Sequence, residues 1–257
     1  MNRRIRRAVV AVSAALALSV AAALGLGAGR APAPPPAPTG ATVFGAASLT
    51  EVFRAMAPKN TYNFAGSDQL SFQIEQGAPA DVFAAASPKY PEALYDKKIV
   101  FKPHVFATNR VVVIVPKSNP AKIRSIYDLA NSGVKLVIGD ANVPIGAYTR
   151  AAFKALGLNA ALANVVSNEQ DVKAVVAKVA LGEADAGLAY ITDVRPVKKK
   201  VTAIAIPAAG QPLVEYEIAV VRGAKHRAAA SAFVRYLLTK PGRAALDGFG
   251  FGLPGRG

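Results

Sequence analysis

The stretch Asp171–Tyr190 (DVKAVVAKVALGEADAGLAY) reads as a helix followed directly by a buried strand. Four valines between Val172 and Val179 recur at i, i+3, i+4 and i+7, which is the spacing of one helix face. Gly182 stands where this helix should stop, and Ala186–Tyr190 is an apolar run of strand length. A helix that leads into a buried strand is the repeating unit of α/β folds.

The same alternation continues on both sides of this stretch. Further apolar runs that predict buried strands are Ala41–Phe44, Asp81–Ala85, Val111–Val115, Val134–Ile138, Val201–Ile206 and Val214–Val221. Segments whose apolar residues have helical spacing lie between these runs, for example Ser67–Gln76 and Lys225–Leu238. Gly77 and Gly157 mark expected helix ends. Nearly continuous apolar strands that alternate with helices favour parallel α/β sheets.

Two long β-rich segments, Arg110–Pro116 (RVVVIVP) and Val214–Val221 (VEYEIAVV), interrupt this rhythm. A chain that leaves one α/β lobe, builds a second and returns would explain them as paired crossover strands. We therefore expect lobe one to comprise residues 41–107 and 216–257, and lobe two to comprise residues 108–215. Periodicity leaves a single larger sheet open as the alternative.

The N-terminus has the parts of an export signal. Met1–Arg7 is basic, Ala8–Ala28 is apolar, and a Pro-rich segment follows, so we expect a signal peptide over 1–30 and a linker over 31–40. The apolar run exceeds the roughly 7–15 residues usual for a cleaved signal and could span a bilayer. The protein is therefore expected to be exported, periplasmic or extracytoplasmic, and membrane-tethered if the segment is not cleaved.

The composition excludes several classes of function. With 52% hydrophobic and 18% charged residues in 257, the chain is not disordered, since disorder requires low hydrophobicity and dense charge. The absence of cysteine excludes disulfides, thiol nucleophiles and Cys-ligated metals. His104 and His226 are the only histidines, so a His-rich metal site is excluded, and neither lies near a Gly-x-Ser-x-Gly elbow. We expect no catalytic residues and no direct metal ligands.

The net charge of +15 raises the question of nucleic acid binding. Five of these charges are arginines within residues 1–40, and no aromatic residues are interleaved with the basic run Lys198–Lys200. We expect this run and Arg243 to be solvated faces. A basic nucleic-acid-binding protein is therefore the remote alternative, and no nucleic acid partner is expected.

Polar residues cluster at the expected helix starts. Ser48 and Glu51 form a Ser-x-x-Glu capping box after the first strand, and Ser67 is the natural N-cap of the next helix. Pro144 lies near the first turn of a third helix, and Asp171 near the start of a fourth. Free backbone N–H groups and the helix dipole make such starts suitable for anions. Spacing alone does not show that the four starts converge.

Several of these segments resemble a known family. Val43–Thr50 (VFGAASLT), Gly77–Phe83 (GAPADVF), Val143–Gly146 (VPIG) and Tyr190–Asp193 (YITD) look like the signature segments of molybdate-binding periplasmic proteins of ABC importers, in the same order and spacing. The resemblance runs from about residue 41 to the C-terminus. It implies a type II periplasmic binding protein fold with two α/β lobes, each a mostly parallel sheet flanked by helices, joined by crossover hinge strands.

The resemblance also implies ligands by position. Ser48 and Ser67 would donate hydroxyl and backbone N–H hydrogen bonds from lobe one. Ile145 and Val172 would donate backbone N–H groups from helix starts in lobe two, and Tyr190 its phenolic hydroxyl. Molybdenum would be held only as the molybdate (or tungstate) oxyanion, with no further cofactor. The implied partner is the membrane permease of an ABC importer, and the protein is expected to be a monomer.

Two residues depart from the family pattern. Asp68 stands where relatives often have serine, and a carboxylate about 5 Å from a dianion would cost several kcal/mol at an effective dielectric of about 20. We therefore expect Asp68 to point away from the anion, towards its own helix start. Ile145 replaces what is commonly a small residue, so its bulk could narrow the site.

Three other functions compete with molybdate capture. A binding protein for sulfate or another tetrahedral oxyanion would use the same fold. An enzyme is disfavoured because Ser48 has no evident base beside it. The effector domain of a transcription regulator shares the fold but needs a DNA-binding segment, and residues 1–40 are not one.

Overall fold

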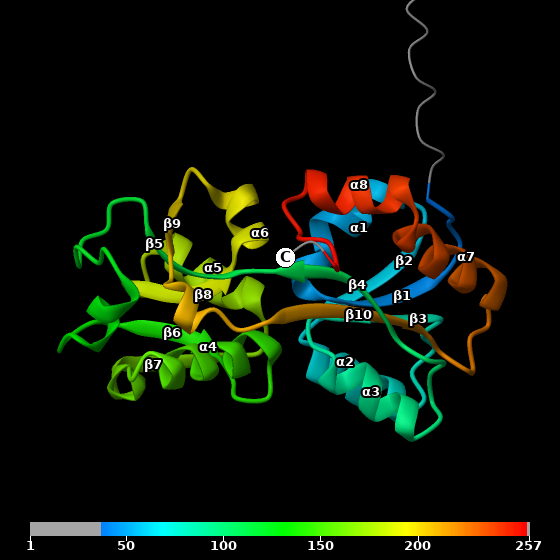
Figure 1. The fold of residues 1–257 in the computed structure, drawn as a ribbon, viewed down its shortest axis with the longest axis horizontal. Helices are drawn as coiled ribbons and strands as arrows, with labels where there is room; N and C mark the ends of the chain where they lie inside the picture. Colours follow the sequence, from blue (N-terminus) through cyan, green and yellow to red (C-terminus); the bar gives the residue numbers. More distant parts are fainter. Residues whose placement is uncertain (1–36, 256–257) are drawn as a thin grey trace, which may run out of the picture. The chain divides into compact units, whose positions relative to one another are not determined.

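The computed structural model describes residues 37–255, so the predicted signal peptide lies outside the described residues. This part of the chain holds two five-stranded sheets with helices packed against them (Figure 1). The first sheet, in the order β2-β1-β3-β10-β4, consists of Thr61–Ala65, Thr42–Ala46, Val82–Ala85, Val214–Val220 and His104–Asn109. The second, in the order β7-β6-β8-β5-β9, consists of Val165–Glu169, Leu136–Gly139, Ala186–Tyr190, Val111–Pro116 and Val201–Ala205.

Both sheets are mixed. In the first, β1 pairs in parallel with β2 and β3, whereas β10 is antiparallel to β3 and β4. The second repeats this plan, with β6 parallel to β7 and β8, and β5 antiparallel to β8 and β9. We call the first sheet with its helices lobe one and the second sheet with its helices lobe two. Two α/β lobes on one plan agree with the fold that the family resemblance implies.

The chain crosses between the lobes twice. It leaves lobe one between β4 and β5 at Arg110, and it returns between β9 and β10 (Figure 1). The predicted lobe boundaries at 107/108 and 215/216 lie beside these crossings. The alternative of one larger sheet is wrong, because the strands divide between two separate sheets.

The expected pairing of Arg110–Pro116 with Val214–Val221 is also wrong. β10 pairs with β3 and β4 in lobe one, and β5 pairs with β8 and β9 in lobe two. The strand beside β10 at the crossing is β4, whose sequence HVFATN mixes polar and apolar residues and gave no strand signal. The two long segments belong to different lobes because the chain crosses over just before the first of them.

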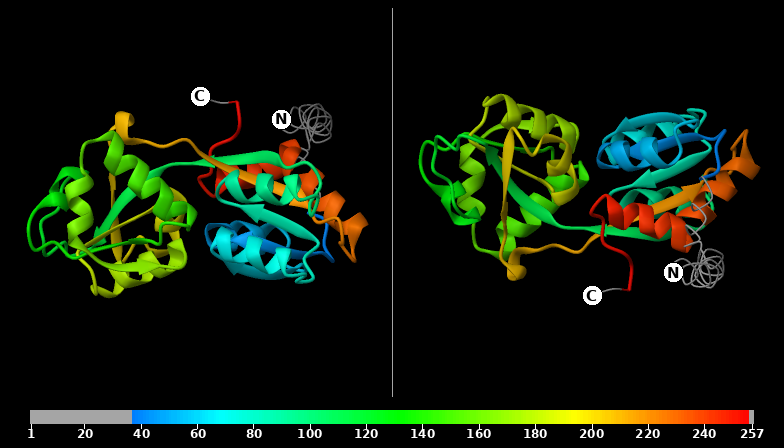
Figure 2. Two further views of the ribbon diagram at one scale, coloured as in Figure 1. Left: turned by 90° about the horizontal axis from the view of Figure 1, so that it is seen from below. Right: turned by 90° about the horizontal axis from the view of Figure 1, so that it is seen from above.

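Helices cover the sheets as the apolar spacing predicts. The α-helices are α1 (Thr50–Met56), α2 (Ser67–Glu75), α3 (Lys89–Asp96), α4 (Pro144–Ala155), α5 (Val172–Leu181), α6 (Ile191–Val194), α7 (Arg227–Leu238) and α8 (Lys240–Gly248). On lobe one, α2 and α3 lie on one face of the sheet, and α1, α7 and α8 on the other (Figures 1 and 2). Separate groups of buried apolar side chains fill the two faces, with Leu70 and Leu94 on the first and Phe53 and Phe233 on the second.

The predicted starts and stops of α4 and α5 are confirmed. Asp171 is the N-cap of α5, and its carboxylate accepts a hydrogen bond of 2.9 Å from the backbone N–H of Ala174. Gly182 ends the same helix with φ of 75°, a left-handed conformation that costs glycine little. Pro144 is the first residue of α4, where its missing N–H has no helical partner to lose.

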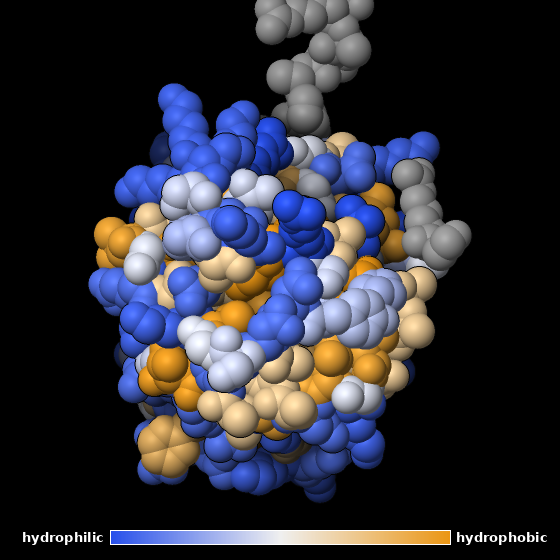
Figure 3. Space-filling view, turned by 90° about the vertical axis from the view of Figure 1, so that its left-hand side faces the viewer, coloured by the Kyte–Doolittle hydropathy of each residue, from blue (hydrophilic) through white to orange (hydrophobic). Residues whose placement is uncertain are grey.

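The surface of lobe two mixes hydrophilic and apolar side chains. Figure 3 shows its end, where hydrophilic side chains surround apolar ones in the middle of the face. Tyr127, Val166 and Leu181 are exposed large apolar side chains of this lobe.

The expectation that Lys198–Lys200 and Arg243 are solvated is confirmed, since all four are exposed. Within residues 37–255, no helix is both long and apolar enough to cross a membrane.

Candidate anion-binding site

A small cavity lies between the two lobes; it comprises about 210 Å³ of space between atoms, part of which is open to solvent. Lobe one lines it with Ala46, Ala47, Ser48, Ala65, Gly66, Ser67 and Ala86, and lobe two with Val143, Pro144, Ile145, Asp171, Val172 and Tyr190. The structure therefore brings together all five residues that the sequence singled out: Ser48, Ser67, Ile145, Val172 and Tyr190. All five are buried. Their role as anion ligands stays a prediction.

Four helix starts meet at this cavity. They belong to the 3₁₀ turn η1 (Ala47–Leu49) that leads into α1, and to α2, α4 and α5. The first N–H groups of a helix have no acceptor within it, and the helix dipole adds partial positive charge there. Among residues 37–255, no lysine or arginine lines the cavity. The one acid in the lining, Asp171, caps α5. The potential anion donors at the cavity are thus neutral groups.

Ser48 does not form the predicted capping box. It lies within η1, and neither η1 nor α1 has a side-chain cap. Its buried hydroxyl is hydrogen-bonded to the hydroxyl of Tyr216 at 2.8 Å, and the Glu51 carboxylate binds Lys173 instead of the helix start. The local pattern fails because both side chains have stronger partners far along the chain.

Ser67 is not the N-cap of α2 as predicted, because Gly66 takes that position. As the first residue of the helix, Ser67 is buried, and its Oγ accepts a hydrogen bond of 3.0 Å from the backbone N–H of Ala86. A hydroxyl that accepts in this way keeps its own proton for another partner. Ser67 also lines the cavity, so its hydroxyl can serve there as a donor.

Tyr190 places a phenolic hydroxyl at the cavity. It ends β8, is 1% exposed, and its hydroxyl has no hydrogen-bond partner among residues 37–255. Burial raises the pKa of this phenol well above its usual value, so the hydroxyl stays protonated. A buried donor without an acceptor costs about 1–3 kcal/mol. A bound anion would remove that cost.

Lobe two also supplies two backbone donors. Ile145 and Val172 occupy the second position of α4 and the first of α5, where no acceptor within the helix is available. The side chain of Ile145 is buried, and its Cγ2 packs so closely on β6 that a Cβ added at Gly139 would lie 2.8 Å from it. Only the N–H of each residue is needed as a donor, so an apolar side chain at either position is compatible with anion binding.

Asp68 does not line the cavity. Burial raises the pKa of its carboxyl, and the backbone N–H groups of Asp68 and Gln69 at the start of α2 oppose that shift. The expectation that Asp68 stays out of the site agrees with this lining, whereas its buried Oδ1 has no hydrogen-bond partner among residues 37–255. The Asp140 carboxylate in lobe two raises this pKa further, so the pair adds repulsion at the rim of the cleft.

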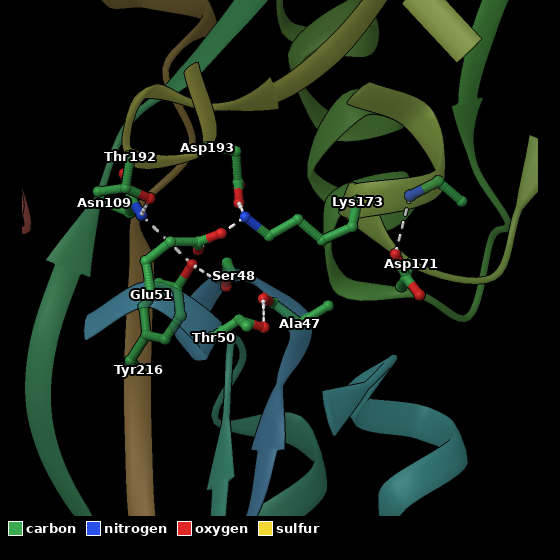
Figure 4. A network of polar contacts seen from close by, with 11 residues as sticks. Ala47, Ser48, Thr50, Glu51, Asn109, Asp171, Lys173, Thr192, Asp193 and Tyr216 are labelled. Carbon is green, nitrogen blue, oxygen red and sulfur yellow. Dashed lines mark hydrogen bonds and ion pairs between the residues drawn. The ribbon is translucent and has the colours of Figure 1, made fainter. Parts of the chain in front are cut away.

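Polar contacts also join the lobes around the cavity. Lys173 of α5 reaches across to Glu51 of α1, with Nζ to Oε2 at 2.7 Å, and also contacts Asp193 at 3.2 Å (Figure 4). A second contact joins Gln69 Nε2 to Gln170 Oε1 at 3.1 Å. These contacts hold the lobes in a closed arrangement. These contacts have no signal in the sequence, because Lys173 falls at an ordinary exposed position of the helix pattern.

The charged groups of this cross-lobe contact shift one another's pKa. Burial raises the pKa of the Asp193 carboxyl to about 6, although the Lys173 ammonium opposes the shift. Burial alone would lower the pKa of Lys173, but the carboxylates of Asp193 and Glu51 more than offset it and leave that pKa raised. Lys173 therefore stays charged, and its charge is neutralised within the protein.

The sequence was compared with protein families and with known proteins. Residues 41–252 match the family model described as bacterial extracellular solute-binding protein. The molybdate-binding protein ModA of Mycobacterium tuberculosis is 39% identical over 222 residues, which cover 82% of this chain and 84% of that protein.

Two solved structures show the same fold. The periplasmic molybdate-binding protein of Azotobacter vinelandii has a TM-score of 0.75 at 20% identity, over 84% of this chain and 100% of that one. The sulfate-binding protein SubI of Mycobacterium tuberculosis has a TM-score of 0.71 at 17% identity, over 85% and 88%. From the match of its sequence over residues 41–252, the chain belongs to the bacterial extracellular solute-binding protein family.

Proposed function

We propose that this protein captures molybdate, or the similar tungstate, outside the cytoplasm and delivers it to the permease of an ABC importer. One observation carries the proposal: buried, uncharged donors from both lobes converge on one small cavity that no lysine or arginine of the described part of the chain lines. In our assignment Ser48, Ser67 and Tyr190 donate through hydroxyls, and Ile145 and Val172 through backbone N–H groups. The ligand named for the relative at 39% identity, molybdate, supports this choice of anion.

Neutral donors are sufficient for tight binding of a dianion. A hydrogen bond to a charged group contributes roughly 1.5–3 kcal/mol. Five to seven such bonds contribute about 8–21 kcal/mol together, and the upper part of that range covers both the ~8 kcal/mol of a micromolar complex and the cost of association. The donors stand on helix starts and buried side chains, so little ordering is needed when the anion binds.

Sulfate is the rival ligand on this fold. The sulfate-binding protein resembles this chain at 17% identity, a likeness that extends to the fold alone. The relative at 39% identity is a molybdate-binding protein, which favours molybdate.

The remaining features of the proposal concern location and partners. Residues 1–40 carry the pattern of an export signal and linker, which supports a periplasmic or extracytoplasmic protein, tethered if the signal stays uncleaved. We propose a monomer that acts by binding, without catalysis, without a cofactor and without nucleic acid. The named relatives are binding proteins, in line with this role.

Ser67→Ala tests the assigned site directly. Loss of this hydroxyl should weaken molybdate binding by about 1.5–3 kcal/mol, or roughly 10–100-fold, because it removes one bond to a charged group. Isothermal titration calorimetry measures the change. Ser71→Ala is the matched control, since Ser71 is buried on the same helix but does not line the cavity. Equal affinity in the Ser67 and Ser71 variants would refute the assignment.

A further inference from the structure

We propose that Tyr216 and Asn109, neither of which lines the cavity, are positioning residues whose hydrogen-bond chain fixes the Ser48 hydroxyl as a donor to the bound oxyanion. The inference rests on the proposed function, because it requires Ser48 to be a ligand. Its residues are Asn109, the last of β4, Tyr216 of β10 and Ser48 of η1 (Figure 4).

The first link fixes the direction of the Asn109 amide. The backbone N–H of Arg110 donates to Asn109 Oδ1 at 2.9 Å, so that end of the amide is the oxygen. The other end, Nδ2, is only a donor. Its two protons go to Thr192 Oγ1 at 2.9 Å and to the Tyr216 hydroxyl oxygen at 3.3 Å. The Tyr216 oxygen therefore accepts a hydrogen bond from Asn109.

The second link follows from counting protons on Tyr216. Its hydroxyl has one proton, and that proton cannot go to Asn109 Nδ2, which is itself a donor. Ser48 Oγ, at 2.8 Å, is the acceptor within reach. The reverse arrangement, with Ser48 donating to Tyr216, would leave the buried phenol proton pointing at an N–H group. Ser48 Oγ is thus the acceptor in this bond.

The third link is the free proton of Ser48. A serine hydroxyl normally rotates between several acceptors, but here its oxygen already accepts from Tyr216. Since Ser48 is buried and lines the cavity, its own proton is left for a ligand there. A donor that is oriented before the ligand arrives loses less entropy on binding.

Aromatic side chains packed around Tyr216 keep this hydrogen-bond chain rigid. Tyr216 is fully buried, with the rings of Phe106 and Phe251 packed edge-on at centroid distances of 6.2 and 5.5 Å. Burial holds its pKa well above the usual value, so the phenol keeps its proton. Through Thr192 of α6 the hydrogen-bond chain also reaches lobe two, beside the point after Asn109 where the polypeptide leaves lobe one.

The test is Tyr216→Phe, which removes one hydroxyl and keeps the ring. We expect molybdate affinity, measured by isothermal titration calorimetry, to fall roughly 3–10-fold, the range for one neutral hydrogen bond. Tyr62→Phe is the matched control: the Tyr62 hydroxyl bonds the carbonyls of Phe53 and Ala57 at 2.9 Å in lobe one, and Tyr62 does not line the cavity. Its loss should leave affinity unchanged.

A double-mutant cycle separates positioning from general support of the fold. If Tyr216 acts through Ser48, then Tyr216→Phe should have no further effect on affinity in the Ser48→Ala background. A residue that only supports the fold would cost the same factor in both backgrounds, and that result would overturn the proposal. Melting curves of the ligand-free variants show whether each one folds.

Asn109→Asp changes the first residue of the same hydrogen-bond chain. A carboxylate there accepts the Tyr216 proton, which frees Ser48 to turn its proton to Tyr216 and away from the anion. We expect a loss of affinity at least as large as in Tyr216→Phe, and unchanged affinity would contradict the chain. If Ser48→Ala itself leaves binding intact, the proposed site fails. If Ser48→Ala weakens binding and Tyr216→Phe does not, the site stands and this inference fails.

Discussion

Replacing Gly66 by alanine should weaken molybdate binding by at least about 100-fold without destabilising the ligand-free protein. Gly66 precedes α2 in lobe one, and an added Cβ would lie 2.4 Å from the backbone carbonyl oxygen of Gln170 in lobe two. Real Cβ atoms do not approach other atoms so closely, so the lobes would have to stay roughly 1 Å further apart. Hydrogen bonds of normal length do not survive such a shift.

The size of this effect follows from the donors that would be lost. Ile145, Val172 and Tyr190 all stand on lobe two, so an anion held by lobe one would lose contact with them. Losing even two bonds to a charged group costs about 3–6 kcal/mol, which is a factor of ~10²–10⁴ in affinity. The backbone of Gly66, with φ of −58° and ψ of 140°, suits alanine. Within lobe one the added Cβ would lie 2.6 Å from Asp68 Oδ1, the end of a side chain that can turn aside, so lobe one itself should still fold.

Calorimetric titration and small-angle scattering check this prediction together. Gly66→Ala should bind molybdate weakly and show little reduction in radius of gyration when molybdate is added. Gly223→Ala is the control, because no atom lies within 4 Å of the position of an added Cβ there. A Gly66→Ala protein that binds as tightly as the unmutated one would show that closure is not needed.

Sulfate and phosphate should bind at least about a hundredfold more weakly than molybdate, whereas tungstate should bind similarly. Sulfate has the same charge and shape as molybdate but shorter bonds, so only the placement of donors can separate them. In a closed site with fixed donors, the smaller anion cannot reach both lobes at good hydrogen-bond lengths. The loss of two contacts gives the expected factor of ~10²–10⁴.

Phosphate faces a second obstacle in the direction of the hydrogen bonds. Ser67 Oγ already accepts from Ala86, and Ser48 Oγ is hydrogen-bonded to Tyr216. A proton remaining on the ligand would therefore find donors where it needs an acceptor. Competition titrations with the four anions measure the ranking. Displacement of molybdate by sulfate at comparable concentration would overturn the choice of ligand and leave the fold unaffected.

The α/β fold was predictable because its signals are local. The valine stripe of α5 and the apolar runs of β3 and β8 each specify their own element. The sequence pattern does not predict strands β2 and β7, because they are half-exposed and mix polar with apolar residues, as in TYNFA and VVSNE. Pairing across the hinge was mispredicted because apolar content does not determine which sheet a strand enters.

The candidate site was only partly within reach of the sequence. Resemblance to a known family placed the five residues, but their meeting at one cavity is a property of the folded chain. Ser48 and Glu51 have the spacing of a capping box, yet their partners Tyr216 and Lys173 lie 168 and 122 positions away. Tyr216 itself reads as an ordinary strand tyrosine, so the hydrogen-bond chain from Asn109 had no sequence signal.

The most direct test of the central claim is a crystal structure of the protein grown with molybdate, with anomalous scattering measured at the molybdenum absorption edge. The account predicts one strong molybdenum peak between the lobes, with its oxygens within about 3.2 Å of the Ser48, Ser67 and Tyr190 hydroxyls and of the Ile145 and Val172 nitrogens. A protein that binds molybdate in solution but shows its molybdenum only beside surface lysines or arginines would contradict it.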